Sequence, residues 1–250
     1  MPVPRISEVI PLPEEATAAH GEPRPARRPR DAATLILLDR SRDGSPTVLM
    51  GRRHERHVFM PGQWVFPGGR TDAGDSRVSV ARPLDPREEA KLIGTGARAS
   101  AARARAIALS AIRETYEEAG LLIGRQGPFS TRSPQWKGFA DNGIQPSLET
   151  LRYIARAITP PGRVRRFDTR FLATWRDAVA MELMDGGLTD ELLDLEWLPL
   201  DRALEGDMPS ITRLVLGDLK LRLAADPELS PGAPVPFYAT RGKRLERRII

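Results

Sequence analysis

The sequence contains no cysteine, which excludes disulfide bonds and thiolate metal sites. It has only three histidines, so its composition disfavours a zinc centre and favours a hard cation held by oxygen ligands. No apolar run approaches the ~20 residues that cross a bilayer, so we expect no membrane span and no membrane partner. The amino-terminal region lacks the apolar core of a secretory signal, and we therefore expect a cytoplasmic protein.

Lysine is scarce as well, because only four of the 38 basic residues are lysines and the others are arginines. The formal net charge of +5 would attract anionic substrates such as phosphates. The arginines are spread along the chain rather than gathered on one expected element, so codon usage explains them better than a nucleic-acid surface does. We expect no nucleic-acid partner.

The chain's 250 residues are enough for one sizeable domain with appendages. Residues 1–30 are rich in proline and arginine and predict an extended or disordered arm. Residues 31–250 are expected to form the folded domain, which starts with the apolar strand 32–38. Within it, residues 76–106 change in composition, and their prolines, glycines and charges predict an inserted excursion with a short helix at 86–93.

The remaining elements follow from apolar patterns. Short apolar segments bounded by turn residues predict strands at 47–50, 64–66, 121–123, 170–175 and 195–198. Longer segments predict helices at 101–118, 147–155 and 211–225, with Ser147 and Ser210 as caps for the last two.

The helix expected at 101–118 runs into the stretch 113–121, which carries the strongest chemical signal. Glu114, Glu117 and Glu118 are spaced so that their carboxylates share one helix face. Like charges repel each other unless a cation lies between them, and a divalent ion would neutralise them better than Arg113 alone. Taken by itself, the pattern fits a metal site and a solvated acidic face equally well.

Gly68 and Gly69 precede this helix and follow the strand expected at 64–66. Glycines let the backbone approach a ligand closely, although glycine pairs are also frequent in plain turns. Together, Gly69, Asp75 and residues 113–121 resemble the signature of the Nudix hydrolases. That signature is a glycine, five residues, a glutamate, seven residues, and then Arg-Glu-apolar-x-Glu-Glu-x-Gly-apolar.

The chain departs from this signature at three points. Asp75 stands in place of the first glutamate, and Thr115 stands in place of an apolar residue. Residues 76–112 place 37 residues before Arg113 where the signature has seven, so the box is split by an insertion. A split box also occurs in a subgroup that resembles the peroxisomal coenzyme A diphosphatases, and the stretch 165–171 is similar to that subgroup.

The resemblance implies an α/β fold, namely a Nudix-type α/β/α sandwich with a mixed sheet and an insertion inside the box. It implies Mg²⁺- or Mn²⁺-dependent hydrolysis of a nucleoside diphosphate linked to another moiety, with coenzyme A or an acyl-CoA as the preferred small-molecule substrate. ADP-ribose, dinucleoside polyphosphates and capped RNA are alternative substrates. A catalytically inactive domain that senses nucleotides is an alternative function. Nudix enzymes are often homodimers, so a homodimer is expected as well.

The resemblance also implies roles for individual residues. Glu114, Glu117 and Glu118 match the metal ligands of the box, and Arg113 matches the arginine that holds a catalytic glutamate in place. Asp75 would be a supporting carboxylate with a shorter reach than glutamate. We count Arg113 and the three glutamates as the candidate catalytic residues.

Substrate binding is expected from the glycine loop, Gly68 and Gly69, and from arginines whose guanidinium groups suit phosphates. These arginines are Arg53, Arg165 and Arg166. The general base is left open between Glu182 and Glu191, because other Nudix enzymes take a base from a loop in this region. Taken singly, each of these glutamates is more typical of an exposed loop.

Overall fold

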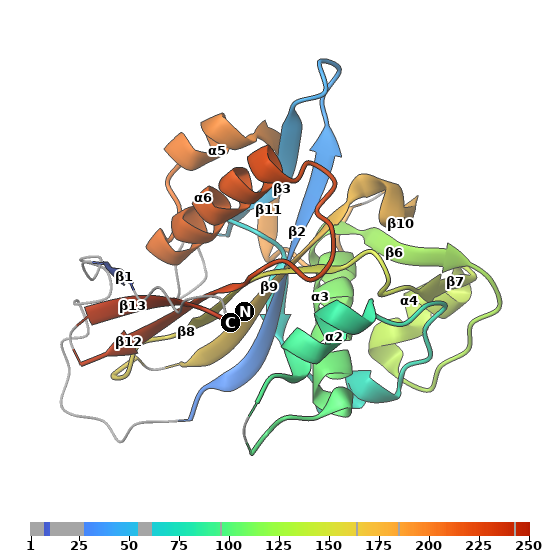
Figure 1. Cartoon of the computed structure of the whole chain (residues 1–250). Helices are drawn as coiled ribbons and strands as arrows, with labels where there is room; N and C mark the ends of the chain where they lie inside the picture. The colour runs from blue at the N-terminus through green and yellow to red at the C-terminus, as the bar shows by residue number, and fades with distance from the viewer. Residues whose placement is uncertain are drawn as a thin grey trace.

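The computed structural model describes residues 8–10, 28–54, 62–95, 97–163, 165–184, 186–242 and 244–250. Within these residues, helices cover both faces of a large mixed sheet (Figure 1). The arrangement is the α/β/α sandwich that the sequence predicts.

The large sheet has the strand order β1-β13-β12-β8-β9-β2-β3-β11, with β4 paired to β3 and β5 paired to β2. Its strands are β1 (Glu8–Ile10), β2 (Arg30–Arg40), β3 (Pro46–Arg53), β4 (Trp64–Val65), β5 (Gly68–Arg70), β8 (Arg152–Ile158), β9 (Phe167–Trp175), β11 (Leu192–Pro199), β12 (Pro236–Arg241) and β13 (Arg244–Ile249). A smaller sheet consists of β6 (Leu121–Gln126), β7 (Ile144–Pro146) and β10 (Val179–Glu182). The helices are α2 (Pro86–Ile93), α3 (Ala101–Ala119), α4 (Lys137–Asp141), α5 (Leu200–Glu205) and α6 (Ser210–Ala225), with short 3-10 turns η1 (Ala73–Arg77), η2 (Pro134–Trp136) and η3 (Arg176–Ala178).

Strand β2 is the centre of the large sheet. It pairs in parallel with β9 along nine residues and in antiparallel fashion with β3 and β5. Alternate residues of β2 point to opposite faces. Leu35 belongs to the core under α3, whereas Ile36 and Leu38 belong to the core under α6. Both faces of β2 are therefore covered, which explains its continuous apolar sequence.

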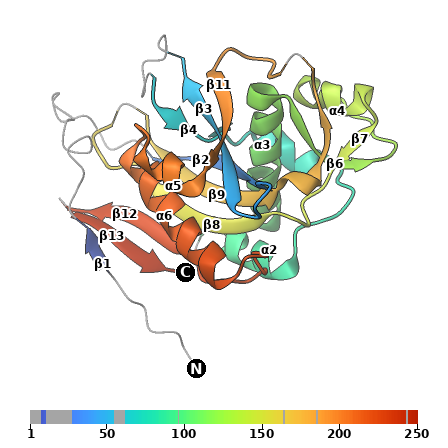
Figure 2. The same cartoon turned by 90° about the horizontal axis from the view of Figure 1, so that it is seen from above.

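The two helical layers divide the core. Helix α3 packs with α2 and α4 on one face, and α5 and α6 cover the other, as Figures 1 and 2 show from two directions. Ser100 caps the start of α3, and Gly120 ends it in the left-handed conformation at φ 71°. The helix therefore has nearly the bounds that its Gly- and Pro-free sequence predicts.

The segment 76–106, which the sequence predicts as an insertion, contacts the sheet and the carboxy-terminal region. Its helix α2 has the predicted bounds, with Asp85 as the N-cap and Gly94 at the end. The buried Glu88 carboxylate accepts hydrogen bonds from the backbone N–H of Tyr153, at 2.8 Å, and of Gly232, at 2.7 Å. One carboxylate thus joins the insertion to the sheet and to the carboxy-terminal region.

The prediction of a helix at 147–155 is wrong. Residues 147–151 form a turn in which Leu148 N donates to Arg82 O and Leu151 N donates to Leu148 O. Strand β8 follows and pairs with β9 and β12. The buried Leu148 and Leu151 have the spacing of a helix face, but here that spacing belongs to a turn that enters a strand. The predicted cap Ser210 is instead the first residue of α6, behind Pro209.

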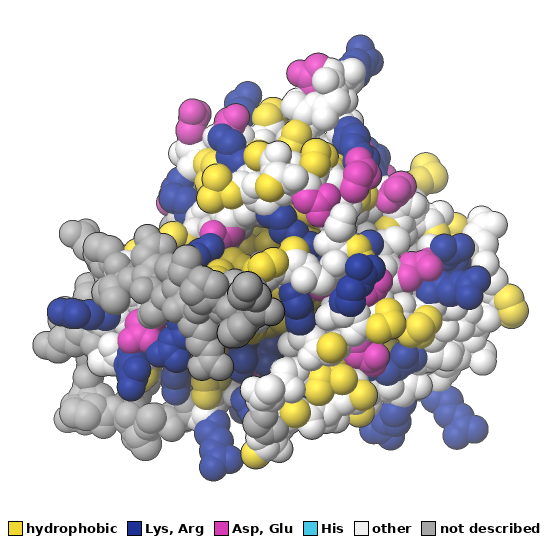
Figure 3. Space-filling view, viewed as in Figure 1, with side chains coloured by type: hydrophobic (Ala, Val, Ile, Leu, Met, Phe, Trp, Pro, Cys, Tyr) yellow, Lys and Arg dark blue, Asp and Glu magenta, His cyan; other side chains and the backbone are white. Residues whose placement is uncertain are grey.

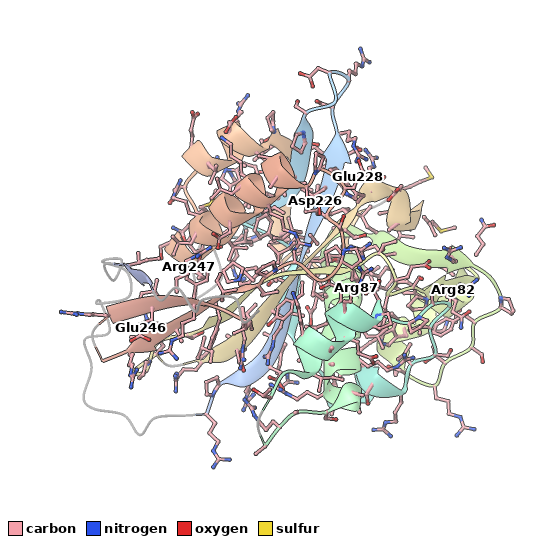
Figure 4. The ribbon with its side chains drawn as sticks, in the orientation of Figure 1. Arg82, Arg87, Asp226, Glu228, Glu246 and Arg247 are labelled. Atoms are coloured by element: carbon pink, nitrogen blue, oxygen red, sulfur yellow. The ribbon has the colours of Figure 1, made fainter. Side chains whose placement is uncertain are left out.

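The carboxy-terminal hairpin β12–β13 extends the sheet and carries β1 at its outer edge. Arg247, labelled in Figure 4 between the hairpin and α6, donates to Asp218 at 2.8 Å. Most of the arm expected at 1–30 lies outside the described residues, and within it Glu8–Ile10 pairs with β13. In the described part of the chain, no helix is long and apolar enough to cross a membrane.

Candidate active site

The three glutamates lie at the carboxy-terminal end of α3, against the glycine loop. Glu118 is 5% exposed, and its Oε2 accepts a hydrogen bond from Gly68 N at 2.9 Å. Gly69 lies so close to Glu114 that a Cβ at this position would overlap the Glu114 carboxylate. A side chain at this position would therefore displace the Glu114 carboxylate from the place it takes beside the loop.

Arg113 joins two of the glutamates to the loop. It is 4% exposed, and its Nη1 lies 2.8 Å from Glu114 Oε1 and 3.0 Å from Glu117 Oε2. Its Nη2 also donates to the carbonyl oxygen of Arg70, at 3.0 Å. One buried guanidinium therefore fixes both carboxylates relative to the strand that carries Gly68 and Gly69.

Asp75 supports Arg113 from the other side. Its carboxylate is 1% exposed and lies 3.3 Å from Arg113 Nε. Trp136 Nε1 donates to the same carboxylate at 3.0 Å. The shorter side chain of Asp75 thus reaches Arg113, and an indole N–H shares the carboxylate with it. Nothing in the sequence around Trp136 indicates this contact with the site.

The segment 186–191 is docked on the end of α3. A Cβ on Gly187 would overlap the Glu118 carbonyl, and the N–H groups of Leu188 and Thr189 donate to the Glu117 carbonyl at 2.6 and 3.1 Å. These bonds satisfy a carbonyl that the end of a helix leaves without an intrahelical partner. They also bring Glu191 close to the three helix glutamates, whose pKa values its charge raises.

Burial is the main influence on the acidity of this cluster. It raises the pKa of Glu118 to about 8, although the Gly68 hydrogen bond acts in the opposite direction. Burial also raises the pKa of Glu114 and of Glu117, against the lowering effect of Arg113. The three carboxylates are thus harder to ionise here than in water, because Arg113 offsets the cost of burial only in part.

This donor set fits a hard divalent cation, because it consists of clustered carboxylates with incomplete charge compensation. As their side chains are placed, no three His, Cys, Asp or Glu residues of the described chain are close enough together to hold a metal ion. Arg113 Nη1 contacts Glu114 and Glu117, and Glu118 is bound to Gly68 N.

The predicted substrate arginines lie in two different places. Arg53, at the end of β3, is near enough to Glu118 to lower its pKa, and the buried Arg53 Nε has no hydrogen-bond partner among the described residues. Arg165 and Arg166 lie in the β8–β9 turn, where Arg166 O accepts from the N–H of Arg30 at the start of β2. Gly68 pairs with Thr34, so this turn lies about 13 Å along β2 from the glycine loop at ~3.3 Å per residue.

Charge on the surface is mixed. On the face shown in Figure 3, Lys and Arg side chains are interspersed with acidic and apolar ones over several elements. This distribution agrees with the even spread of arginine along the sequence.

No protein-family model matches the chain. Among solved structures, the chain is similar to a Nudix hydrolase from Alicyclobacillus acidocaldarius, with a TM-score of 0.59 and 25% identity over 79% of this chain and 96% of that one. Lower similarity is found to the Nudix domain of Shewanella oneidensis NrtR complexed with ADP ribose, with a TM-score of 0.45, 13% identity and coverage of 85% and 99%. A C. elegans Ap4A hydrolase gives a TM-score of 0.41, 15% identity and coverage of 78% and 98%.

Proposed function

We propose that this chain, an enzyme with the fold of the Nudix hydrolases, uses Glu114, Glu117 and Glu118 to hold Mg²⁺ or Mn²⁺ and hydrolyse a nucleotide-linked diphosphate. The observation that carries the proposal is the packing of these carboxylates around Arg113 and against the glycine loop. A solvated acidic face, the alternative reading of the sequence, would leave the glutamates exposed, whereas Glu118 is 5% exposed.

Each residue has a defined task in this proposal. A bound divalent ion supplies neutralisation of the phosphate oxygens and a lowered pKa for bound water. Arg113 holds Glu114 and Glu117 in place, and Asp75 holds Arg113. Arg53 lies near enough to Glu118 to lower its pKa, so we assign its guanidinium group to a substrate phosphate beside the carboxylates.

Glu191 is the general base that we propose. Its charge raises the pKa of all three helix glutamates, so Glu191 lies near them. In this position it can accept a proton from the attacking water. Glu182, the other candidate, is exposed and lies 3.4 Å from Arg176 in a surface ion pair. The bonds that dock residues 188–189 on α3 favour Glu191 because they hold its loop in place.

Coenzyme A or an acyl-CoA is the substrate that we propose. Support for this choice comes from the resemblance of the split box and of residues 165–171 to the coenzyme A diphosphatases. We also propose that the enzyme is a cytoplasmic homodimer. Light scattering on the purified protein measures its mass, and a monomer over the whole concentration range would contradict the dimer.

The test is hydrolysis of a substrate panel by purified wild-type, E117Q, E118Q and E182Q proteins. The panel contains coenzyme A, acetyl-CoA, ADP-ribose, diadenosine tetraphosphate and capped RNA, each with Mg²⁺, with Mn²⁺ and with EDTA. We expect metal-dependent cleavage of coenzyme A by the wild type and E182Q, and a loss of at least about 100-fold in E117Q and E118Q.

Three results would change the conclusion. Full metal-dependent activity in folded E117Q and E118Q would refute the assigned metal ligands. Cleavage of another panel member at a higher kcat/KM would replace the coenzyme A assignment. Nucleotide binding without any hydrolysis would identify the domain as an inactive sensor.

A further inference from the structure

A cavity of about 830 Å³ lies at the opposite end of α3 from the glutamates. Its walls come from the start of β2, from the segment 70–76 that follows β5, and from the first turns of α3. The cavity is lined by five arginines, namely Arg28, Arg30, Arg70, Arg98 and Arg103. Two aspartates, Asp31 and Asp72, also line it, so positive charge predominates.

Four of these arginines are available to a ligand. Arg28, Arg30 and Arg70 are exposed, and none of them forms an ion pair within the described part of the chain. Arg98 comes from the insertion, and its side chain is 58% exposed. Its Nη2 lies 3.6 Å from Asp168 Oδ2, which is longer than a hydrogen bond. These guanidinium groups have donors to spare for an anion.

The inner wall of the cavity is rigid. Arg103 Nε donates to Asp31 Oδ2 at 2.7 Å, and Arg103 Nη2 donates to Asp31 Oδ1 at 2.5 Å. Arg170 Nη1 contacts the same aspartate at 3.0 Å. Burial acts to raise the pKa of Asp31, but the hydrogen bonds and charge of Arg103 outweigh it and hold the pKa below its ordinary value. Asp31 is therefore ionised at neutral pH and fixes two arginines behind the cavity.

Another aspartate lies behind this wall. Asp168 is fully buried and accepts two hydrogen bonds from Arg156, both at 2.8 Å. It also lies 3.1 Å from Arg170 Nη1 and 3.7 Å from Arg103 Nη2. Two carboxylates thus form ion pairs with three arginines, Arg103, Arg156 and Arg170. This group keeps a net positive charge behind the exposed arginines of the cavity.

We propose that this cavity binds a phosphate group, held by Arg30 and Arg98 at its rim. Guanidinium groups suit phosphate because their planar N–H donors match its oxygens. Ala102, in the first turn of α3, also lines the cavity, and the positive end of the helix adds to the attraction. The proposal rests on the arginines, and the positive end of α3 is an additional attraction for a phosphate.

The cavity is close enough to the glutamates to serve one substrate molecule. Ala106, at the cavity, and Glu114 are eight residues apart on α3, which corresponds to about 12 Å at ~1.5 Å per residue. Arg70 links the two places, because it lines the cavity and its carbonyl accepts from Arg113. The phosphate has two possible sources, a second phosphate of the substrate or a free phosphorylated effector. Only the first source rests on the proposed function.

The first experiment measures binding without catalysis. Inorganic phosphate is titrated calorimetrically in EDTA into wild type, R30Q/R98Q and the control R77Q/R82Q. Arg77 and Arg82 are exposed, form no ion pair with described residues and do not line the cavity, so the control removes the same charge. We expect R30Q/R98Q to weaken binding at least about tenfold and the control to change it by less than about twofold.

The second experiment separates the two sources. Coenzyme A carries a phosphomonoester apart from its diphosphate, and 3′-dephospho-coenzyme A lacks it. If the cavity holds this group, wild type and R77Q/R82Q have a lower KM for coenzyme A than for 3′-dephospho-coenzyme A. R30Q/R98Q is then expected to have similar KM values for the two substrates. If it holds a free effector, added phosphate changes the rate on both substrates alike, and R30Q/R98Q loses that response.

The proposal is overturned if wild type binds no phosphate, or if R30Q/R98Q and R77Q/R82Q bind it equally. The calorimetric result does not depend on hydrolysis. A chain that cleaves no diphosphate would refute the proposed function and leave the binding result standing.

Discussion

Replacing Glu118 with glutamine is expected to stabilise the metal-free protein at alkaline pH. The pKa of Glu118 is raised from 4.5 to about 8 because its carboxylate is buried. Between these values the folded protein keeps a proton that the unfolded chain has lost, so the folded state becomes less stable as the pH rises. At ~1.4 kcal/mol per pH unit, the total loss approaches about 5 kcal/mol. Glutamine is neutral at every pH, and its amide oxygen can still accept from Gly68 N.

The measurement is urea denaturation of wild type, E118Q and E182Q in EDTA at several pH values from 5 to 9. We expect the free energy of unfolding of the wild type to fall across this range, and that of E118Q to fall much less. A smaller slope is expected to remain in E118Q, because the pKa values of Glu114 and Glu117 are also raised. E182Q, altered at an exposed carboxylate, should follow the wild type.

Parallel pH profiles for wild type and E118Q would refute the reasoning, since they would mean that Glu118 is ionised without cost in the folded protein. Added Mn²⁺ provides a second check at pH 8. It should raise the melting temperature of the wild type more than that of E118Q, because the glutamine lacks the charge that binds the ion.

Three further substitutions test separate parts of the site and its support. Trp136→Phe removes the N–H donor to the buried Asp75 and should cost about 1–3 kcal/mol in urea denaturation; an unchanged midpoint would deny the contact any importance. Gly69→Ala should lower kcat about 100-fold by displacing a carboxylate, and wild-type kcat in steady-state assays would count against it. Glu88→Ala leaves two buried N–H groups without an acceptor and should lower stability by about 2–4 kcal/mol, whereas Glu89→Ala should leave the melting temperature nearly unchanged.

Local sequence was sufficient to predict the helices that have clear capping residues at their ends. Helix α2 has the predicted bounds because Asp85 caps it and Gly94 ends it. Helix α3 ends where Gly120 takes the left-handed conformation. Strand β2 was predictable because a strand covered on both faces must be apolar throughout. In each case, the signal lies within a few residues of the element.

Elements that depend on distant partners were not predictable in the same way. The hairpin β12–β13 has a polar sequence and is held by pairing with β8 and by the contact between Arg247 and Asp218. Strand β8 was mistaken for a helix because its neighbours Leu148 and Leu151 have helical spacing. Sheet pairing decides both cases, and the partner strands are far away in the sequence.

The candidate site likewise combines residues that a local pattern predicts with contacts between residues far apart in the sequence. The three glutamates and Arg113 were predictable as a group, because helix periodicity alone places their side chains together. The contact of Trp136 with Asp75 joins residues 61 positions apart, and no local pattern encodes it. The placement of Arg165 and Arg166 at the far end of β2 likewise depends on strand register rather than on composition.

The segment 76–106 was expected as an insertion inside the box, and its contacts decide how any role in substrate choice must be tested. Glu88 and Lys91 bind backbone groups of β8 and of the carboxy-terminal region, so deleting the insertion would remove support for the sheet. Loss of activity after deletion would therefore say nothing about specificity. Arg98 and Arg103 come from the same segment and line the cavity. Arg103 is bound to an aspartate, whereas the side chain of Arg98 is mostly exposed. Substitutions at exposed positions such as Arg98 can thus separate substrate choice from folding.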